Sequence, residues 1–242
     1  MPDGFKDVTA AILAGGLGTR LRSVVADRPK VLAPVSGRPF LAYLLAQLER
    51  VGIPETILLI GFKGEQVQSA FGNQFGKMRL AYSQESEPLG TGGAVRLALP
   101  LLQRETVLMM NGDSYCDLDL EAYLKHHTKR HEASLALAHV ENASRFGRVH
   151  LGDNDNVARF EEKNPVPSPG WINAGIYLFR RDLIGEIETG PQSLERDVLP
   201  KWVASGRVRG YRGSGRFIDI GVPESYSDAE AFFAAIGKDM TT

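Results

Sequence analysis

The chain has 242 residues, of which 43% are hydrophobic and 24% are charged. Lysine and arginine total 28 against 29 aspartates and glutamates, which gives a formal net charge of -1 at pH 7. Proteins that bind nucleic acid normally carry a basic excess, so this balance argues against a nucleic-acid partner. It leaves room for small anionic ligands, because a pocket can be locally basic in a protein that is neutral as a whole.

Cys116 is the only cysteine, which excludes an intramolecular disulfide and a zinc site built from cysteines. Nothing around it indicates thiolate chemistry, so we expect a small pocket or core residue. Residues 1–7 lack the basic region and apolar run of a signal peptide, and no stretch reaches the ~18 apolar residues of a membrane-spanning helix. We therefore expect a soluble, cytoplasmic protein without a membrane partner.

Short apolar runs alternate along the chain with amphipathic helical stretches. Residues 8–13 are the first apolar run, and residues 40–51 place apolar side chains on one face of a helix that Gly52 would end. Further strands are predicted at residues 56–60, 107–110, 135–140 and 172–179, and a terminal helix at residues 224–236 after Pro223.

The alternation of strands and helices predicts an α/β fold. Strands separated by helices favour parallel pairing, with helices on both faces of the sheet. Ligands in such folds bind beyond the carboxyl ends of the strands.

The first motif that carries chemistry follows the first strand directly. Residues 13–20 have the sequence LAGGLGTR, in which glycines let the backbone approach a phosphate and Arg20 adds a fork-shaped donor. Lys30 follows between Pro29 and Pro34 in an apolar segment, where a buried ammonium would need an anion such as a ligand phosphate. The motif matches neither the dinucleotide pattern nor the P-loop, and a plain glycine-rich turn is the alternative interpretation.

Together these two motifs resemble the sugar-1-phosphate nucleotidyltransferase family. The resemblance continues in the expected order and covers about residues 8–236. Its further motifs are EPLGTGGA at 87–94, NGD at 111–113, FG at 146–147, EK at 162–163, NAGIY at 173–177 and FIDIG at 217–221. The chain departs from the family at one point, because Asn164 separates the EK pair from Pro165.

The resemblance implies a Rossmann-like nucleotidyltransferase fold, with a mixed, mostly parallel sheet and helices on both faces. It implies one catalytic domain over residues 1–242, with a nucleotide-binding half over about 1–115 and a sugar-phosphate-binding half over about 116–242. The implied substrates are a nucleoside triphosphate and a sugar 1-phosphate, and the implied cofactor is Mg²⁺. The oligomeric state stays open, a homo-oligomer included.

The family motifs also imply roles for individual residues. Those expected to bind the nucleotide are Leu13, Ala14, Gly15, Gly16, Gly18, Thr19, Glu85, Gly90 and Thr91. Those expected to bind the sugar phosphate are Gly147, Glu162, Lys163 and Asn173. Those expected to be catalytic are Arg20, Lys30, Asp113 and Asp219, of which Asp113 and Asp219 would hold the metal.

The chemistry of the residues agrees with this assignment. Nucleotidyl transfer brings two anionic reactants together, so cations and a metal must neutralise them. Arg20, Lys30 and Lys163 supply cations, while Asp113 and Asp219 follow apolar runs as hard-metal ligands do. An ionised sugar phosphate needs no covalent nucleophile, which fits the absence of a G-x-S-x-G elbow. Taken singly, each aspartate could instead be a turn or cap residue.

The nucleobase is predicted from two neighbouring residues. In uridylyl- and thymidylyl-transferring relatives a glutamine near Gln84 is the group expected to contact the base. A carboxylate such as Glu85 only accepts hydrogen bonds, which suits the adjacent N1–H and N2–H donors of guanine. Glu85 therefore favours GTP, with rotation of Gln84 into the site as the alternative.

Among short family members, several runs are similar to guanylyltransferases acting on D-glycero-alpha-D-manno-heptose 1-phosphate. These runs are residues 21–25, 37–41, 112–116 and 217–224. No hexapeptide repeats of an appended β-helix are visible. The alternatives are mannose 1-phosphate as acceptor, uridylyl, thymidylyl or cytidylyl transfer to another sugar phosphate, and a non-catalytic nucleotide-sensing subunit.

Overall fold

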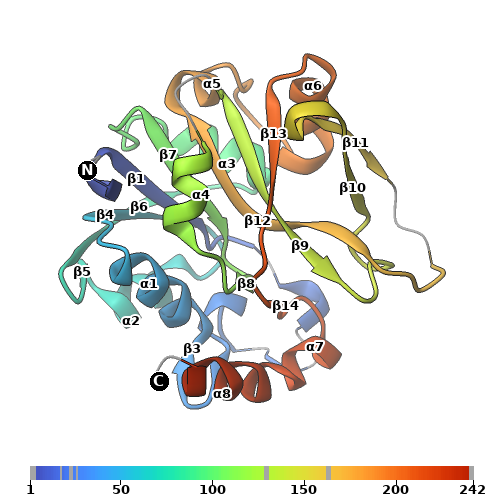
Figure 1. The fold of residues 1–242 in the computed structure, drawn as a ribbon. Helices are drawn as coiled ribbons and strands as arrows, with labels where there is room; N and C mark the ends of the chain where they lie inside the picture. The colour runs from blue at the N-terminus through green and yellow to red at the C-terminus, as the bar shows by residue number, and fades with distance from the viewer. Residues whose placement is uncertain are drawn as a thin grey trace.

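The computed structural model of the chain describes residues 4–16, 18–21, 24–25, 27–127, 131–161 and 165–239. Eight strands form its central sheet: β1 (Val8–Leu13), β4 (Glu55–Ile60), β5 (Gln74–Phe75), β6 (Met78–Gln84), β7 (Thr106–Asn111), β9 (Ala133–Val140), β12 (Gly170–Arg180) and β13 (Val208–Arg212). Their order across the sheet is β13-β9-β12-β7-β1-β4-β6-β5, so β1 lies near the middle (Figure 1).

The sheet is mixed and mostly parallel, as predicted. β1 pairs in parallel with β4 and β7, and the pairs β4–β6 and β9–β13 are also parallel. The expectation of parallel pairing is wrong for β12, which runs antiparallel to both β7 and β9. The reason lies in the connection, since the chain returns from β9 through a two-stranded ribbon, β10 (Arg148–Leu151) and β11 (Val157–Glu161), rather than through a crossover helix.

Helices cover both faces of the sheet. One face packs against α1 (Phe40–Arg50), α2 (Gly64–Phe71), α4 (Leu120–His126) and α8 (Ala229–Asp239). The other packs against α3 (Gly90–Ala98), α5 (Arg181–Gly185) and α6 (Leu199–Ala204). Within β1 the side chains alternate as a strand requires, because Ala10 and Ile12 join the first core while Ala11 joins the second.

The predicted terminal helix is in fact two helices. α7 (Pro223–Ser227) is followed by Asp228 as its C-cap, and α8 starts at the next residue, Ala229. Ser225 and Ser227 donate to the carbonyls of Val222 and Glu224, and such local hydrogen bonds compete with a continuous helix. The prediction for α1 is confirmed, and Gly52 follows it with φ 79° while its N–H donates to the Glu49 carbonyl.

Two small ribbons connect the sheet to the C-terminal helices. They are β2 (Pro34–Val35) with β3 (Arg38–Pro39), and β8 (Ser114–Cys116) with β14 (Phe217–Asp219). Figure 1 shows β14 between β8 and α7, and α8 beside α1 and β3. Phe233 of α8 stacks on Tyr43 of α1 with ring centroids 3.8 Å apart, so α8 is packed against the segment that follows the β2–β3 turn.

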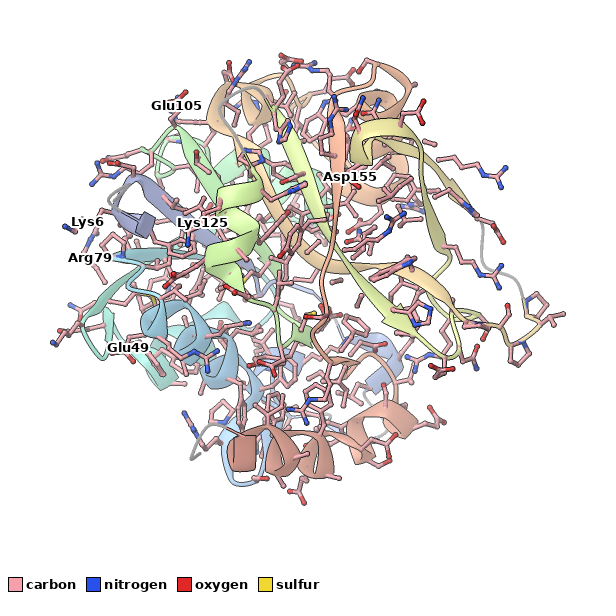
Figure 2. All side chains as sticks on the ribbon, viewed as in Figure 1. Lys6, Glu49, Arg79, Glu105, Lys125 and Asp155 are labelled. Carbon is pink, nitrogen blue, oxygen red and sulfur yellow. The ribbon has the colours of Figure 1, made fainter. Side chains whose placement is uncertain are left out.

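Charged side chains of both signs are spread over the surface. Lys6, Arg79 and Glu105 lie at the left of the view in Figure 2, and all three residues are exposed. Within the described ranges, none of the helices has the length and apolar character needed to cross a membrane.

Candidate active site

A cavity of about 670 Å³ opens where four neighbouring strands end. Its walls come from the segments that follow the carboxyl ends of β1, β4, β6 and β7, which is where ligands bind in open α/β sheets. The predicted site residues that line it are Leu13, Gly15, Gly16, Lys30, Glu85, Gly90, Thr91 and Asp113.

Glu85 lies at one end of this cavity, held between two glycine loops. A β-carbon at Gly61 would come within 2.5 Å of Glu85 Oε1, and one at Gly15 within 3.2 Å, so both positions need glycine for this carboxylate to fit. Glu85 Oε2 accepts a hydrogen bond from the Leu89 N–H at 3.0 Å. Burial raises the pKa of Glu85, and the Leu89 N–H partly offsets the rise. Gln84 also lines the cavity but is exposed.

The start of α3 forms a second wall. Gly90 has φ 69°, and a β-carbon there would lie 2.5 Å from the Gln192 carbonyl oxygen. Thr91 Oγ1 donates to Glu195 Oε2 at 2.8 Å and accepts from the Leu194 N–H at 2.8 Å. Glu195 thereby lines the same cavity.

Sequence reasoning missed Glu195. It lies 104 residues from Thr91, in a segment whose pattern does not distinguish it from a surface glutamate. Only the packing of residues 190–195 on the start of α3 brings it to the cavity.

Lys30 and Asp113 form an ion pair at the other end of the cavity. Lys30 Nζ lies 2.7 Å from Asp113 Oδ2, and the Lys30 side chain is only 11% exposed. Gly112 lets the segment before Asp113 pack closely on the end of β1, because a β-carbon there would lie 2.2 Å from the Leu13 carbonyl oxygen and 2.9 Å from Val31. The anion that pairs with Lys30 in the structure is a carboxylate of the protein.

Asp219 lies next to Asp113 because of the β8–β14 ribbon. Asp219 pairs with Ser114, the residue after Asp113, and the Ile220 N–H donates to the Asp113 carbonyl at 2.8 Å. A β-carbon at Gly221 would lie 2.6 Å from Asp219 Oδ1 and 3.5 Å from Lys30 Nζ. The two carboxylates and the lysine therefore form one charged cluster.

Asp219 also has a cationic partner, which sequence reasoning did not identify. Arg145 Nη2 donates to Asp219 Oδ1 at 3.2 Å and to Oδ2 at 3.0 Å. The one available signal is its position directly before the predicted FG turn at residues 146–147.

Two adjacent carboxylates fit a magnesium ion. Mg²⁺ is usually bound by one or two carboxylates, with waters and substrate phosphates completing its shell. Asp113 and Asp219 supply that donor set, and their neutralisation by Lys30 and Arg145 shows that this cluster attracts positive charge. Within the described ranges, no cluster of three or more histidine, cysteine or acidic side chains forms an all-protein cage.

Other predicted residues lie outside the lining of this cavity among the described residues. Ala14 is buried, Gly18 lies against Lys30 with φ 59°, and Arg20 is exposed. Thr19 is described only as part of a one-turn helix, Thr19–Leu21. Glu162 and Lys163 lie outside the described residues.

The remaining predicted sugar-phosphate residues lie on the second half of the chain. Gly147 has φ 76° and ends the turn before β10. Asn173 lies in β12, where Nδ2 donates to the Tyr177 hydroxyl at 2.8 Å and Oδ1 accepts from the Gly175 N–H at 2.9 Å. Both polar atoms of Asn173 therefore have partners within the strand.

Cys116 is buried, as predicted for a packing residue. Burial raises the pKa of its thiol to about 12, with a smaller contribution from the nearby Asp117 carboxylate. The thiol is therefore neutral and unreactive near pH 7.

Comparisons with known proteins agree with this geometry. The family model described as "Nucleotidyl transferase" matches residues 9–235. The D-glycero-alpha-D-manno-heptose 1-phosphate guanylyltransferases of Aneurinibacillus thermoaerophilus and Campylobacter jejuni are 38% and 37% identical to the chain, over 91% and 90% of it and 96% of each relative. The crystal structure of HddC from Yersinia pseudotuberculosis complexed with GMP-PN superposes with a TM-score of 0.84 and 32% identity, over 93% of this chain and 99% of HddC.

Proposed function

Because this chain belongs to the nucleotidyl transferase family, we propose that it transfers GMP from GTP to D-glycero-alpha-D-manno-heptose 1-phosphate. The products are a GDP-heptose and pyrophosphate. The observation that carries the proposal is the similarity to named heptose 1-phosphate guanylyltransferases over nearly the full length of both chains.

The choice of guanine rests on Glu85. Its carboxylate is half-buried at one end of the cavity, and both oxygens keep acceptor capacity after Oε2 accepts the Leu89 N–H. Guanine offers N1–H and N2–H side by side, which match a carboxylate, whereas uracil and thymine offer a single N–H between two carbonyls.

The phosphates belong at the opposite end of the cavity. Gly16 presents open backbone to the cavity and Gly18 lies against Lys30, so a triphosphate lying along this glycine loop would meet the Lys30 ammonium. In that position Lys30 would exchange its pairing with Asp113 for a pairing with a phosphate oxygen. Arg20, exposed on the one-turn helix after the glycines, is proposed as a further phosphate ligand.

The metal site is proposed at Asp113 and Asp219. A bound Mg²⁺ would neutralise phosphate charge and orient the two reactants as a Lewis acid and template. The sugar phosphate is already ionised, so the chain's residues need only position it for attack on the α phosphorus. We assign that positioning to the second half of the chain, about residues 116–242, through Gly147, Glu162, Lys163 and Asn173.

The proposal is tested by initial rates of pyrophosphate release with Mg²⁺. GTP, UTP, dTTP, CTP and ATP are each combined with heptose, mannose, glucose and amino-sugar 1-phosphates. The proposal predicts the highest kcat/KM for GTP with the heptose phosphate. A preference for mannose 1-phosphate or for another nucleotide would retain the reaction class and refute the assignment of substrate.

A further inference from the structure

Arg145 connects the sugar-phosphate side of the molecule to the proposed metal site. It lies in the turn between β9 and β10, whereas Asp219 ends β14, and 74 residues separate the two. Its Nη2 contacts both oxygens of the Asp219 carboxylate, at 3.2 and 3.0 Å. The guanidinium thus occupies the outer face of a carboxylate that the proposed function gives to a divalent cation.

The carboxylate does not depend on Arg145 for its orientation. Asp219 Oδ1 accepts the Gly221 N–H at 2.6 Å, and the Ser225 hydroxyl lies 3.5 Å away. The Asp219 side chain is 13% exposed, so these contacts fix it in a largely buried position. Loss of the guanidinium would therefore leave the carboxylate in place and without a cationic partner on that face.

The surroundings of Arg145 allow its guanidinium to separate from Asp219. Its side chain is 42% exposed, so water can solvate the released guanidinium. Its guanidinium carbon also lies 5.2 Å from the centre of the Phe146 ring, a favourable contact that does not involve Asp219. Phe146 packs edge-on against Phe217 of β14 at 5.5 Å, so the turn stays attached to β14 when the ion pair opens.

We propose that Arg145 is a counter-ion of Asp219 that competes with a divalent cation for the carboxylate and yields it when the cation binds. A double positive charge outcompetes a half-exposed guanidinium for the same oxygens. The exchange also frees a cation on the side where the sugar phosphate is proposed to bind. This inference rests on the proposed metal site at Asp113 and Asp219.

The test is a double-mutant cycle on metal affinity. Mn²⁺ alone is titrated into the full-length protein, and free Mn²⁺ is followed by EPR. Arg145→Met should bind Mn²⁺ about two- to fivefold more tightly than the unaltered protein, because no ion pair has to open. In the Asp219→Asn background, Arg145→Met should have no such effect, because the shared carboxylate is gone.

Arg148→Met is the matched control. It removes the same charge three residues further along the chain, from an arginine whose ion-pair partner is Glu161 instead of Asp219. It should leave Mn²⁺ affinity nearly unchanged, which separates the specific contact from the loss of net charge. Thermal melts of each variant without metal report whether the fold is intact.

Three outcomes would overturn the inference. They are unchanged or weaker Mn²⁺ binding by Arg145→Met, an equal effect of Arg148→Met, and an effect of Arg145→Met that persists without the Asp219 carboxylate. Failure of the proposed function is seen separately, as absence of pyrophosphate release by the unaltered protein with every nucleotide and sugar phosphate.

Discussion

Replacing Glu85 by glutamine tests the assignment of the nucleobase. The change keeps the size of the side chain and an oxygen for the Leu89 N–H, but it replaces a charged acceptor by an amide. Hydrogen bonds to charged groups contribute about 1.5–3 kcal/mol, so kcat/KM for GTP should fall about 10- to 100-fold. The assay is pyrophosphate release with GTP and with UTP under the same conditions, and UTP use should not fall in parallel.

Glu87→Gln is the matched control for Glu85→Gln. Glu87 also lines the cavity, but it is exposed. The control should change kcat/KM for GTP by less than about twofold. An unchanged GTP preference in Glu85→Gln, or a larger loss in Glu87→Gln, would refute the placement of guanine against Glu85.

The same variant has a consequence for stability. Because burial raises the pKa of Glu85, the folded protein holds this proton more tightly than the unfolded chain. The stability that Glu85 contributes is therefore fully present below its ordinary pKa and is lost as pH rises through the raised value. Glu85→Gln should melt at a higher temperature than the unaltered protein at pH 7, and the advantage should disappear below about pH 4. Equal melting temperatures at pH 7 would contradict the cost of burying this carboxylate.

Three further predictions follow from single contacts. Lys30→Met removes an ammonium 2.7 Å from Asp113 and should lower kcat about 100- to 1000-fold; steady-state kinetics showing less than a tenfold loss would contradict its proposed role. Gly112→Ala places a β-carbon 2.2 Å from the Leu13 carbonyl oxygen and should lower the free energy of unfolding, measured with urea, by about 3 kcal/mol. A change below about 0.5 kcal/mol would contradict the tight packing. Burial lowers the pKa of His127 to about 4, so the stability that the neutral His127 contributes is lost as pH falls from about 6.5 towards 4. His127→Gln should therefore make the melting temperature less dependent on pH in this range. An unchanged pH dependence would contradict the burial of His127.

The parts of the fold that local sequence controls could be predicted. β1 and the glycines after it, α1 with Gly52, and the turn Asn111–Asp113 after β7 all follow from apolar periodicity and turn chemistry over a few residues. Their convergence follows too, because strands of a parallel sheet end at one edge. Glu85 and Asp113, which follow β6 and β7, therefore line one cavity, and Lys30 lines it with them.

The parts that depend on long-range packing could not be predicted. Arg145 reaches Asp219 only because the turn before β10 packs on β14, and Glu195 reaches Thr91 only because residues 190–195 pack on α3. Neither pair leaves a recognisable pattern in the sequence, because the residues around an exposed arginine or glutamate do not reveal its distant partner. The antiparallel direction of β12 was not predicted for the same reason, because the β10–β11 ribbon that reverses the chain has no distinctive local sequence.

The most direct test of the central claim is to identify the product formed by the purified protein from GTP and D-glycero-alpha-D-manno-heptose 1-phosphate with Mg²⁺. Mass spectrometry should find a GDP-heptose, with one pyrophosphate released for each molecule formed. The variant carrying both Asp113→Asn and Asp219→Asn should form none, because the carboxylates proposed to hold the metal are gone. GTP binding without any GDP-sugar, or equal product from the doubly substituted variant, would contradict the account.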